Sequence, residues 1–351
     1  MFVKYFLDRF GDKATQAVVG DLRNSMDSID GVLKDLNIID PLTNTLIQAD
    51  DVVSDWASAN YLQDPGVGDG RYAYKDYSDA PKFQETESID RCPSDWQDRT
   101  VNQYGVDYIR ISCRGKYNLK FEGAQEVGVF PADPHSGAYA FWSNKGDGSD
   151  MMLTQTFDFT KVSGPLTMNY WTWYDLEDKF DFVYLEASEN GEDWTILTTP
   201  SCTTDNPTGN SYGCGYTGAN NGWVQQKVDL SNFAGKNVQL RFEYVTDAAV
   251  NGEGFMLDDI AIPEINYGSD FEKDNGGWEP SGFVRIQNQL PQTYLVSIIH
   301  ENGNTTVERL TLNPDQTLNL PVDLQNDVIL TVSGSTRFTL QLANYRFSIQ
   351  P

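Results

Sequence analysis

Residues 171–197, WTWYDLEDKFDFVYLEASENGEDWTIL, contain two apolar runs separated by a short polar segment. The runs Val183–Ser188 and Trp194–Leu197 contain the β-branched and aromatic residues that favour strands. Between them stands Asn190–Gly191, a dipeptide that readily adopts the backbone of a tight hairpin turn. The stretch therefore predicts a β-hairpin.

Strand patterns extend in both directions from this hairpin. They are dense from about residue 138 to residue 262, with no helical pattern between them, which predicts a β-sandwich of jelly-roll type. Two earlier runs, Tyr108–Ser112 and Tyr117–Phe121, are expected to pair with each other around Arg114–Gly115. After residue 266, renewed alternation predicts a second, small β-sandwich.

The first 63 residues have helical periodicity instead. Four short amphipathic helices are expected, and the first should stop at Gly11. No partner layer for their apolar sides is evident. We therefore predict a mainly β chain with an N-terminal helical segment at 1–80. A jelly roll at 81–265, with leading strands at 104–123, and a terminal sandwich at 266–351 would follow.

Acidic side chains dominate the composition. The chain has 351 residues, of which 51 are acidic and 25 basic, so its net charge is −26. Such a surface repels phosphate backbones and argues against nucleic-acid binding. Clustered carboxylates could hold hard cations such as calcium, although a negative surface is also common in extracellular proteins. The sequence contains no run of roughly 18 apolar residues, so it predicts no membrane span.

Four cysteines form two local pairs around loops. We expect disulfides Cys92–Cys113 and Cys202–Cys214, which would imply an oxidising, extracellular compartment. The first ten residues, MFVKYFLDRF, carry internal charges and lack the pattern of a signal peptide. We therefore expect the chain to be a fragment or truncated form of a longer secreted protein.

Three stretches together resemble a known family: residues 135–158, residues 171–197, and residues 222–265, which contain FMLDDIAI. Their succession is similar to the C-terminal region of immune inhibitor A-type metallopeptidases, secreted zinc enzymes of bacteria. The helical start, with VSDWASANYLQD at 53–64, resembles the end of that family's catalytic domain. The resemblance implies an upstream catalytic domain in the same polypeptide and protein substrates as partners.

The chain departs from the family at the zinc motif. The resemblance implies HExxH, in which two histidines one helical turn apart bind zinc and the glutamate activates water. This chain has only His135 and His300. Glu301 follows His300 in what reads as a turn, but position 304 is Asn304 instead of a second histidine. No catalytic residue can be assigned, and zinc is expected only in the upstream part.

Calcium is the other metal that the resemblance implies, because related jelly-roll modules hold it as a structural ion. The candidate ligands are Asp147, Asp150 and Asp258. The segment Asn144–Asp150 places oxygen ligands in a glycine-rich turn. Either Asp258 or the adjacent Asp259 must point inward from its strand. A buried aspartate needs a partner, which could be a cation or the backbone amides of a loop.

Two other readings remain open at this stage. Trp171 and Trp173 lie on one side of a predicted strand and could stack on sugars if they are exposed, although core packing is the more common role. Glu177, Asp178 and Asp181 could be misread as a glycosidase acid–base pair, which requires a particular separation across a cleft.

The resemblance implies a non-catalytic region of a secreted metallopeptidase, which braces the catalytic domain and assists in binding protein substrates. We predict no peptidase activity from this chain alone. The alternative is a stand-alone extracellular adhesion or carbohydrate-binding β-sandwich protein.

Overall fold

The computed structural model describes residues 1–77, 79–301 and 303–351. Two compact units are present: one contains residues 1–129 and 289–351, and the other contains residues 130–288. Ser78 and Asn302, the latter in the turn predicted after His300, lie outside the described residues. The fold is mainly β with its three α-helices near the N-terminus, which confirms the predicted fold class.

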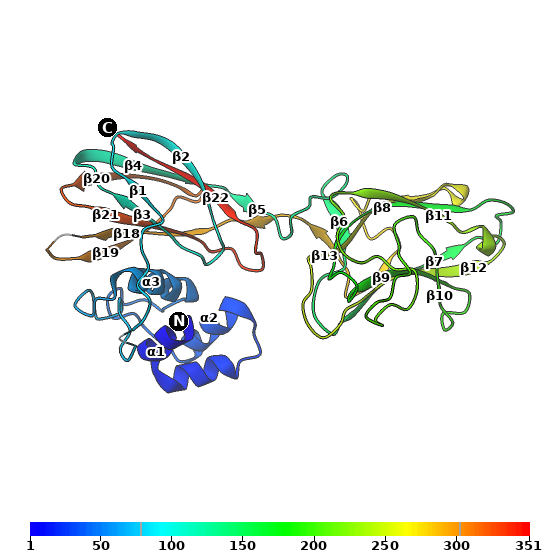
Figure 1. Ribbon diagram of the computed structural model, residues 1–351, viewed down its shortest axis with the longest axis horizontal. Coiled ribbons are helices and arrows are strands. Elements are labelled where there is room, and N and C mark those ends of the chain that lie inside the picture. The colour runs from blue at the N-terminus through cyan, green and yellow to red at the C-terminus, as the bar shows by residue number, and fades with distance from the viewer. Residues whose placement is uncertain (78, 302) are drawn as a thin grey trace. The chain divides into compact units, whose positions relative to one another are not determined.

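The unit of residues 130–288 is a sandwich of two antiparallel sheets (Figure 1). One sheet has the strand order β10-β9-β12-β7-β15, and the other has β11-β8-β13-β6-β16 with β14 beside β13. The strands are β6 Tyr139–Trp142, β7 Asp150–Asp158, β8 Thr167–Asp175, β9 Phe182–Ser188, β10 Thr195–Ile196, β11 Val224–Asp229, β12 Asn237–Val245, β13 Gly254–Ile262, β14 Tyr267–Ser269, β15 Glu279–Ser281 and β16 Val284–Gln287. The predicted hairpin is confirmed, because β9 pairs with β10.

Alternation along these strands builds the core between the two sheets. Tyr170 of β8 and Leu257 of β13 come from one sheet, and Leu185 of β9 and Phe242 of β12 from the other; all four are fully buried. Burial of each such side chain contributes about 1.5–3 kcal/mol to folding. This packed core holds the strand ends, and therefore the loops that carry the candidate site, in fixed positions.

The other unit also contains a β-sandwich. Its sheets have the orders β1-β3-β21-β18-β19 and β2-β22-β4-β20, and a short β5–β17 pair is separate from them. The strands are β1 Glu87–Ile89, β2 Ser94–Val101, β3 Asp107–Ile111, β4 Gly115–Gly123, β5 Glu126–Val127, β17 Leu290–Pro291, β18 Tyr294–His300, β19 Thr306–Leu310, β20 Thr317–Leu324, β21 Val328–Gly334 and β22 Ala343–Gln350.

The helices of this unit are α1 Phe2–Val19, α2 Ser25–Asp35 and α3 Ala49–Leu62. The first two predicted helices form one element, α1, which is kinked at Gly11, where φ is 78°. Only glycine adopts such a φ without strain. The helix that was expected to stop at Gly11 therefore changes direction there and continues to Val19. Among the described residues, no helix is both long and apolar enough to cross a lipid bilayer.

The helices have a partner layer, contrary to the expectation from sequence. Tyr61 of α3 packs with Tyr108, Ile299 and Ile329 of the sheet that contains β3, β18 and β21. The Tyr108 hydroxyl donates to the carbonyl of Ala57 in α3 at 2.8 Å. The apolar side of α3 is therefore buried against strands from this same chain, as Figure 1 shows for α3 and β18.

The pairing predicted around Arg114–Gly115 is wrong. β3 pairs with β1 and β21 in one sheet, whereas β4 pairs with β22 and β20 in the other. The predicted boundaries lie at 80/81 and 265/266, whereas the structure divides into residues 1–129 with 289–351 and residues 130–288. The division differs because strands near residues 94–123 pair with strands near residues 294–350. Local alternation identifies a strand but does not identify its partner, so this long-range pairing could not be seen in the sequence.

Both predicted disulfides are present. Cys92 is bonded to Cys113, and Cys202 is bonded to Cys214. Cys92–Cys113 links the loop between β1 and β2 to the residues that follow β3. Cys202–Cys214 closes a loop of the other unit after β10.

A buried ion-pair network ties the helices to the sheet. Asp55 of α3, which is 1% exposed, forms ion pairs with Arg9, Arg71 and Arg309. Arg71 also donates to Asp40 at 2.7 Å and 2.8 Å. The guanidinium of Arg71 is the main cause that holds the pKa of Asp40 well below its ordinary value. Asp55 therefore joins three segments that are far apart in the chain.

We expect Asp55→Ala to lower the free energy of unfolding of this unit by about 3–5 kcal/mol, because it leaves buried guanidinium groups without their carboxylate. The matched control is Asp35→Ala on α2, since Asp35 is largely exposed and pairs with Arg23 at 3.2 Å. That substitution should cost about 1 kcal/mol or less. Urea unfolding, with hydrogen exchange of α3 peptides to report on this unit, measures both. Equal losses in the two variants would contradict the assigned role of Asp55.

Candidate functional site

Three acidic residues meet at strand ends of the unit of residues 130–288. Asp181 directly precedes β9 and Asp247 follows β12. These strands are paired with Phe182 opposite Val245, so the register itself brings the two aspartates together. Glu177 arrives from the β8–β9 loop, where its carbonyl accepts hydrogen bonds from the amides of Asp181 at 3.1 Å and Phe180 at 3.3 Å.

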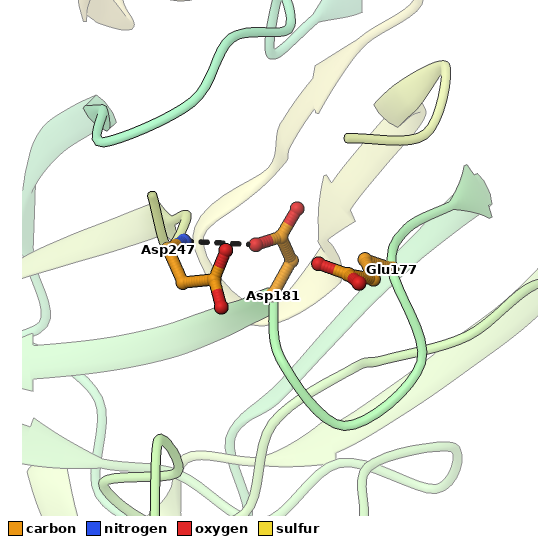
Figure 2. Close-up of side chains that lie close together, drawn as sticks. All are labelled: Glu177, Asp181 and Asp247. Carbon is orange, nitrogen blue, oxygen red and sulfur yellow. Dashed lines mark hydrogen bonds between the residues drawn. The ribbon is translucent and has the colours of Figure 1, made fainter. Parts of the chain in front are cut away.

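The three carboxylates are close enough to share one ion. One oxygen from each of Glu177, Asp181 and Asp247 lies within 4.8 Å of the others. Figure 2 shows Asp181 between the other two, with the carboxylate of Glu177 directed toward it. Asp181 is fully buried and accepts hydrogen bonds from the Asp247 amide at 3.0 Å and the Tyr244 hydroxyl at 3.2 Å. Its position is therefore fixed by backbone and core contacts.

The local charge is not balanced by the protein. In the part of the chain that the structure describes, no basic side chain forms an ion pair with Glu177, Asp181 or Asp247. Burial, followed by the neighbouring carboxylates, raises the pKa of Glu177 above its ordinary value, and burial is also the main cause that raises the pKa of Asp181. One oxygen of Glu177, Oε2, is buried without a hydrogen-bond partner.

This arrangement suits a hard cation. Carboxylate oxygens are preferred ligands of calcium, and a bound cation would relieve the repulsion among the three charges. Zinc fits poorly, because it favours imidazole or thiolate ligands in a tetrahedral set. All four cysteines are in disulfides, and the two histidines lie in different units.

Of the predicted calcium ligands, Asp147 interacts electrostatically with this group. Its charge contributes to the raised pKa values of Glu177 and Asp181, and its carboxylate accepts from Asn251 at 2.7 Å. Asp150 begins β7 opposite Val245 and is exposed. Neither Asp150 nor Asp258 belongs to a group of three or more metal-ligand residues within the described parts of the chain.

Asp258 is the inward-facing aspartate that the sequence predicted, but its partners are amides. It is fully buried in β13 and accepts from the backbone of Ser136 at 3.1 Å and Asp259 at 2.8 Å. Burial raises the pKa of Asp258 to about 7. Asp258 therefore anchors the loop before β6, and this geometry favours the backbone-amide reading over the cation reading.

The two histidines have structural contacts. His135 Nδ1 lies 2.6 Å from Asp259, and its ring stacks on Trp171 with centroids 3.9 Å apart. His300 ends β18, with its Nε2 3.8 Å from a carboxylate oxygen of Glu308. Neither imidazole belongs to a group of three or more possible metal ligands among the described residues.

The tryptophans do not form an open sugar platform. Trp171 and Trp173 lie on the same side of β8, opposite Tyr170 and Tyr174, which belong to the core. The imidazole of His135 covers Trp171, and Trp173 is only 9% exposed. This surface therefore lacks the two accessible indoles that stacking on a glycan requires.

The glycosidase reading also fails on geometry. Glu177 and Asp181 have carboxylate oxygens within 4.8 Å of each other. Glycosidases hold their two carboxyl groups about 5–10 Å apart across a cleft that admits the substrate. Because Asp181 is fully buried, a sugar could not reach it.

Sequence reasoning missed Asp247 as a member of this carboxylate group. It stands in VTDAAVNG at 245–252, where an alternating strand gives way to a turn. An acidic residue at such a strand end is a signal, but its pairing with Asp181 depends on the register of β9 and β12. Glu177 and Asp181 were noticed only as a false catalytic pair.

Comparison with known proteins gives a family match over most of this unit. Residues 123–287 match the family model described as "Immune inhibitor A-like, MAM domain". The chain is 31% identical over 132 residues to immune inhibitor A of Bacillus thuringiensis subsp. alesti, covering 37% of this chain and 18% of that protein. It is 31% identical over 136 residues to the pre-pro-metalloprotease PrtV of Vibrio cholerae serotype O1, covering 38% and 14%.

A third relative is bacillopeptidase F of Bacillus subtilis, which is 29% identical over 141 residues, or 40% of this chain and 9% of that protein. The matched part thus spans less than a fifth of each of these three relatives. Among solved structures, latent PorU from Porphyromonas gingivalis has a TM-score of 0.15 at 11% identity, with 74% of this chain and 32% of that chain covered. That similarity is too low to carry an argument.

The match falls on the unit that carries the carboxylate group and on the stretches that suggested the resemblance. The match of residues 123–287 to the immune inhibitor A-like MAM domain model, together with these relatives, supports the resemblance of this chain to the C-terminal region of immune inhibitor A-type metallopeptidases.

Proposed function

We propose that this chain is a non-catalytic region of an immune inhibitor A-like metallopeptidase. It would brace the catalytic domain of the same polypeptide and assist in binding protein substrates. The family match at residues 123–287 carries this proposal. Support also comes from the ligand set, because His135 and His300 are engaged in separate units and do not fit a catalytic zinc ion. Zinc would belong to the upstream catalytic domain.

Calcium at Glu177, Asp181 and Asp247 is the second part of the proposal. Three carboxylates within 4.8 Å of one another and without a basic partner support it, as does the unpartnered Oε2 of Glu177. The ion would join the β8–β9 loop to the segment after β12. Its role would be structural, because Asp181 is too deeply buried for a substrate to contact it.

An extracellular location fits the same proposal. Two disulfides require an oxidising environment to persist. Calcium is also abundant enough outside cells to fill sites of modest affinity. The alternative, a stand-alone adhesion or carbohydrate-binding protein, loses its original support, because Trp171 is covered by His135 and Trp173 is buried.

We expect calcium to raise the thermal midpoint of the chain after treatment with EGTA. At a calcium concentration about 100 times the dissociation constant, the free energy of unfolding should rise by about 2.7 kcal/mol. This increase corresponds to a rise of roughly 5–10 °C in the thermal midpoint. Asp181→Asn should remove this shift. The variant should also raise the calcium-free midpoint, because it removes one of the mutually repelling charges. Differential scanning calorimetry measures all of these values.

Asp205→Asn is the matched control, because Asp205 is exposed in the same unit. It should leave the calcium shift unchanged. A shift that persists in Asp181→Asn, or that is absent from the unaltered chain, would contradict the assignment.

The calcium shift should also shrink as the pH falls from 7.5 toward 5. Glu177 and Asp181 have pKa values raised above those of unfolded carboxyl groups. Ionisation of these two groups therefore destabilises the folded, calcium-free chain. The destabilisation is absent below the pKa of the unfolded carboxyl groups, about 4, and grows as the pH rises through their pKa in the folded chain. Calcium binds the ionised groups, so its stabilisation is greatest at high pH. A shift independent of pH would exclude these carboxylates as ligands.

The purified chain should not digest casein, with or without added zinc, because its two histidines cannot form the zinc centre of the family. The measurement is release of soluble peptides over several hours. Cleavage that a zinc chelator abolishes would refute the non-catalytic assignment. Sequencing the DNA upstream of the Met1 codon tests the proposed partner: an in-frame HExxH supports it, and an in-frame stop codon contradicts it.

A further inference from the structure

A cavity of about 340 Å³ opens where α3 meets the segments that lead into β1 and β3. These two strands pair in parallel. Residues from the segments just before the pairing, 83–86 and 104–108, line the cavity together with Trp56 and Asn60 of α3. All of them belong to the unit that contains the helices, so the packing of α3 on its sheet holds the walls of the cavity in place.

The lining of this cavity is uncharged and largely aromatic. Among the described residues, those that line it include no acidic or basic side chain, although the chain has 51 acidic and 25 basic residues. Trp56, Tyr104 and Tyr108 contribute rings, as does Phe83, which is 41% exposed. Ligand sites typically measure about 300–1,000 Å³, so the cavity is sized for one bulky group. Such a lining favours an uncharged, apolar group over an ion.

One polar side chain in the cavity wall has an unused donor. Asn60 is 1% exposed, and its Oδ1 accepts from the Tyr74 hydroxyl at 2.7 Å. That hydroxyl accepts from the indole N–H of Trp56 at 2.9 Å, so the orientation of the Asn60 amide is fixed. Asn60 Nδ2 donates to no other described residue, yet it is not sealed within the protein, so it faces the cavity that Asn60 lines. A fixed donor of this kind selects a ligand that supplies an acceptor, such as a carbonyl oxygen.

Backbone groups beside the cavity are also unused. The amide of Thr86 donates to the carbonyl of Tyr108 at 2.8 Å. In contrast, no described residue forms a backbone hydrogen bond with Gln84 or Val106, both of which line the cavity. An extended peptide can pair with such amides and carbonyls, as it does when it adds to the edge of a sheet. A lipid chain cannot, so these groups favour a peptide as the occupant.

We propose that this cavity holds one bulky apolar side chain, aromatic or branched, from an extended segment of a protein substrate. The side chain packs against Trp56, Phe83 and Tyr108, while a carbonyl of the same peptide accepts from Asn60 Nδ2. This inference rests on the proposed assistance in binding protein substrates, to which it adds a site and a preferred side chain. It does not involve the carboxylate group proposed to bind calcium, which belongs to the other unit.

Capped pentapeptides that differ only in a central phenylalanine, leucine, glycine or glutamate test the proposal on the whole chain. Ligand-observed NMR titration measures their dissociation constants. The phenylalanine and leucine peptides should bind about tenfold or more tightly than the glycine peptide, because burial of a large apolar side chain supplies that difference. The glutamate peptide should bind no better than the glycine peptide, because the uncharged lining cannot compensate for a buried carboxylate.

Phe83→Ala removes a partly exposed wall of the cavity, so it should weaken binding of the phenylalanine peptide about fivefold or more with little change in the thermal midpoint. Phe338→Ala is the matched control, because Phe338 is 67% exposed in the same unit and does not line the cavity. It should bind like the unaltered chain. Asn60→Asp keeps the acceptor for Tyr74 but replaces the unused donor, so it should weaken binding about tenfold.

The proposal is overturned if the four peptides bind alike or not at all, or if Phe83→Ala binds like Phe338→Ala. It is also overturned if octanoate binds more tightly than the phenylalanine peptide and depends on Phe83, which would indicate a lipid site. None of these results would refute the accessory role itself. That role fails instead if the chain alone digests casein in a reaction that a zinc chelator abolishes.

Discussion

Three carboxylates are held together by strand register, and among the described residues no basic side chain forms an ion pair with them. The pairing of Phe182 with Val245 brings Asp181 and Asp247 into contact whether or not an ion is present. Since Asp181 is buried among core residues, it cannot turn away to reduce the repulsion. A cation is the simplest means of stabilising the loops at this end of the sandwich.

The other unit meets a similar demand with its own side chains. Asp55 is as deeply buried as Asp181, yet it is surrounded by Arg9, Arg71 and Arg309. One buried acid is thus neutralised by arginines of the chain, whereas among the described residues no basic side chain forms an ion pair with the group around Asp181. In a chain with a net charge of −26, such sites link stability to the ionic composition of the surroundings.

Sequence patterns predicted local structure well and long-range structure poorly. The two disulfides join cysteines that are 21 and 12 residues apart, and the hairpin around Asn190–Gly191 and the break at Gly11 follow from features within a few residues. The separation of β3 from β4 does not, because each alternates correctly and nothing local specifies which strand it pairs with.

The candidate site shows the same limit. The sequence predicts that either Asp258 or Asp259 faces inward, and the structure shows that it is Asp258, whose distant amide partner, Ser136, lies 122 residues away in the chain. Asp247 was overlooked because its significance arises only when β12 pairs with β9. Residue types therefore indicated that oxygen ligands were abundant, while only the register identified which of them meet.

These features describe a chain of two sandwiches: one carries the acidic group and the family match, and the other carries the helices. The most direct test of the central claim is a crystal structure of the chain grown with calcium, with anomalous diffraction used to identify the ion. The account predicts one anomalous peak about 2.3–2.6 Å from oxygens of Glu177, Asp181 and Asp247. A well-ordered site with no peak, or with a lysine or arginine placed among the three carboxylates, would contradict it.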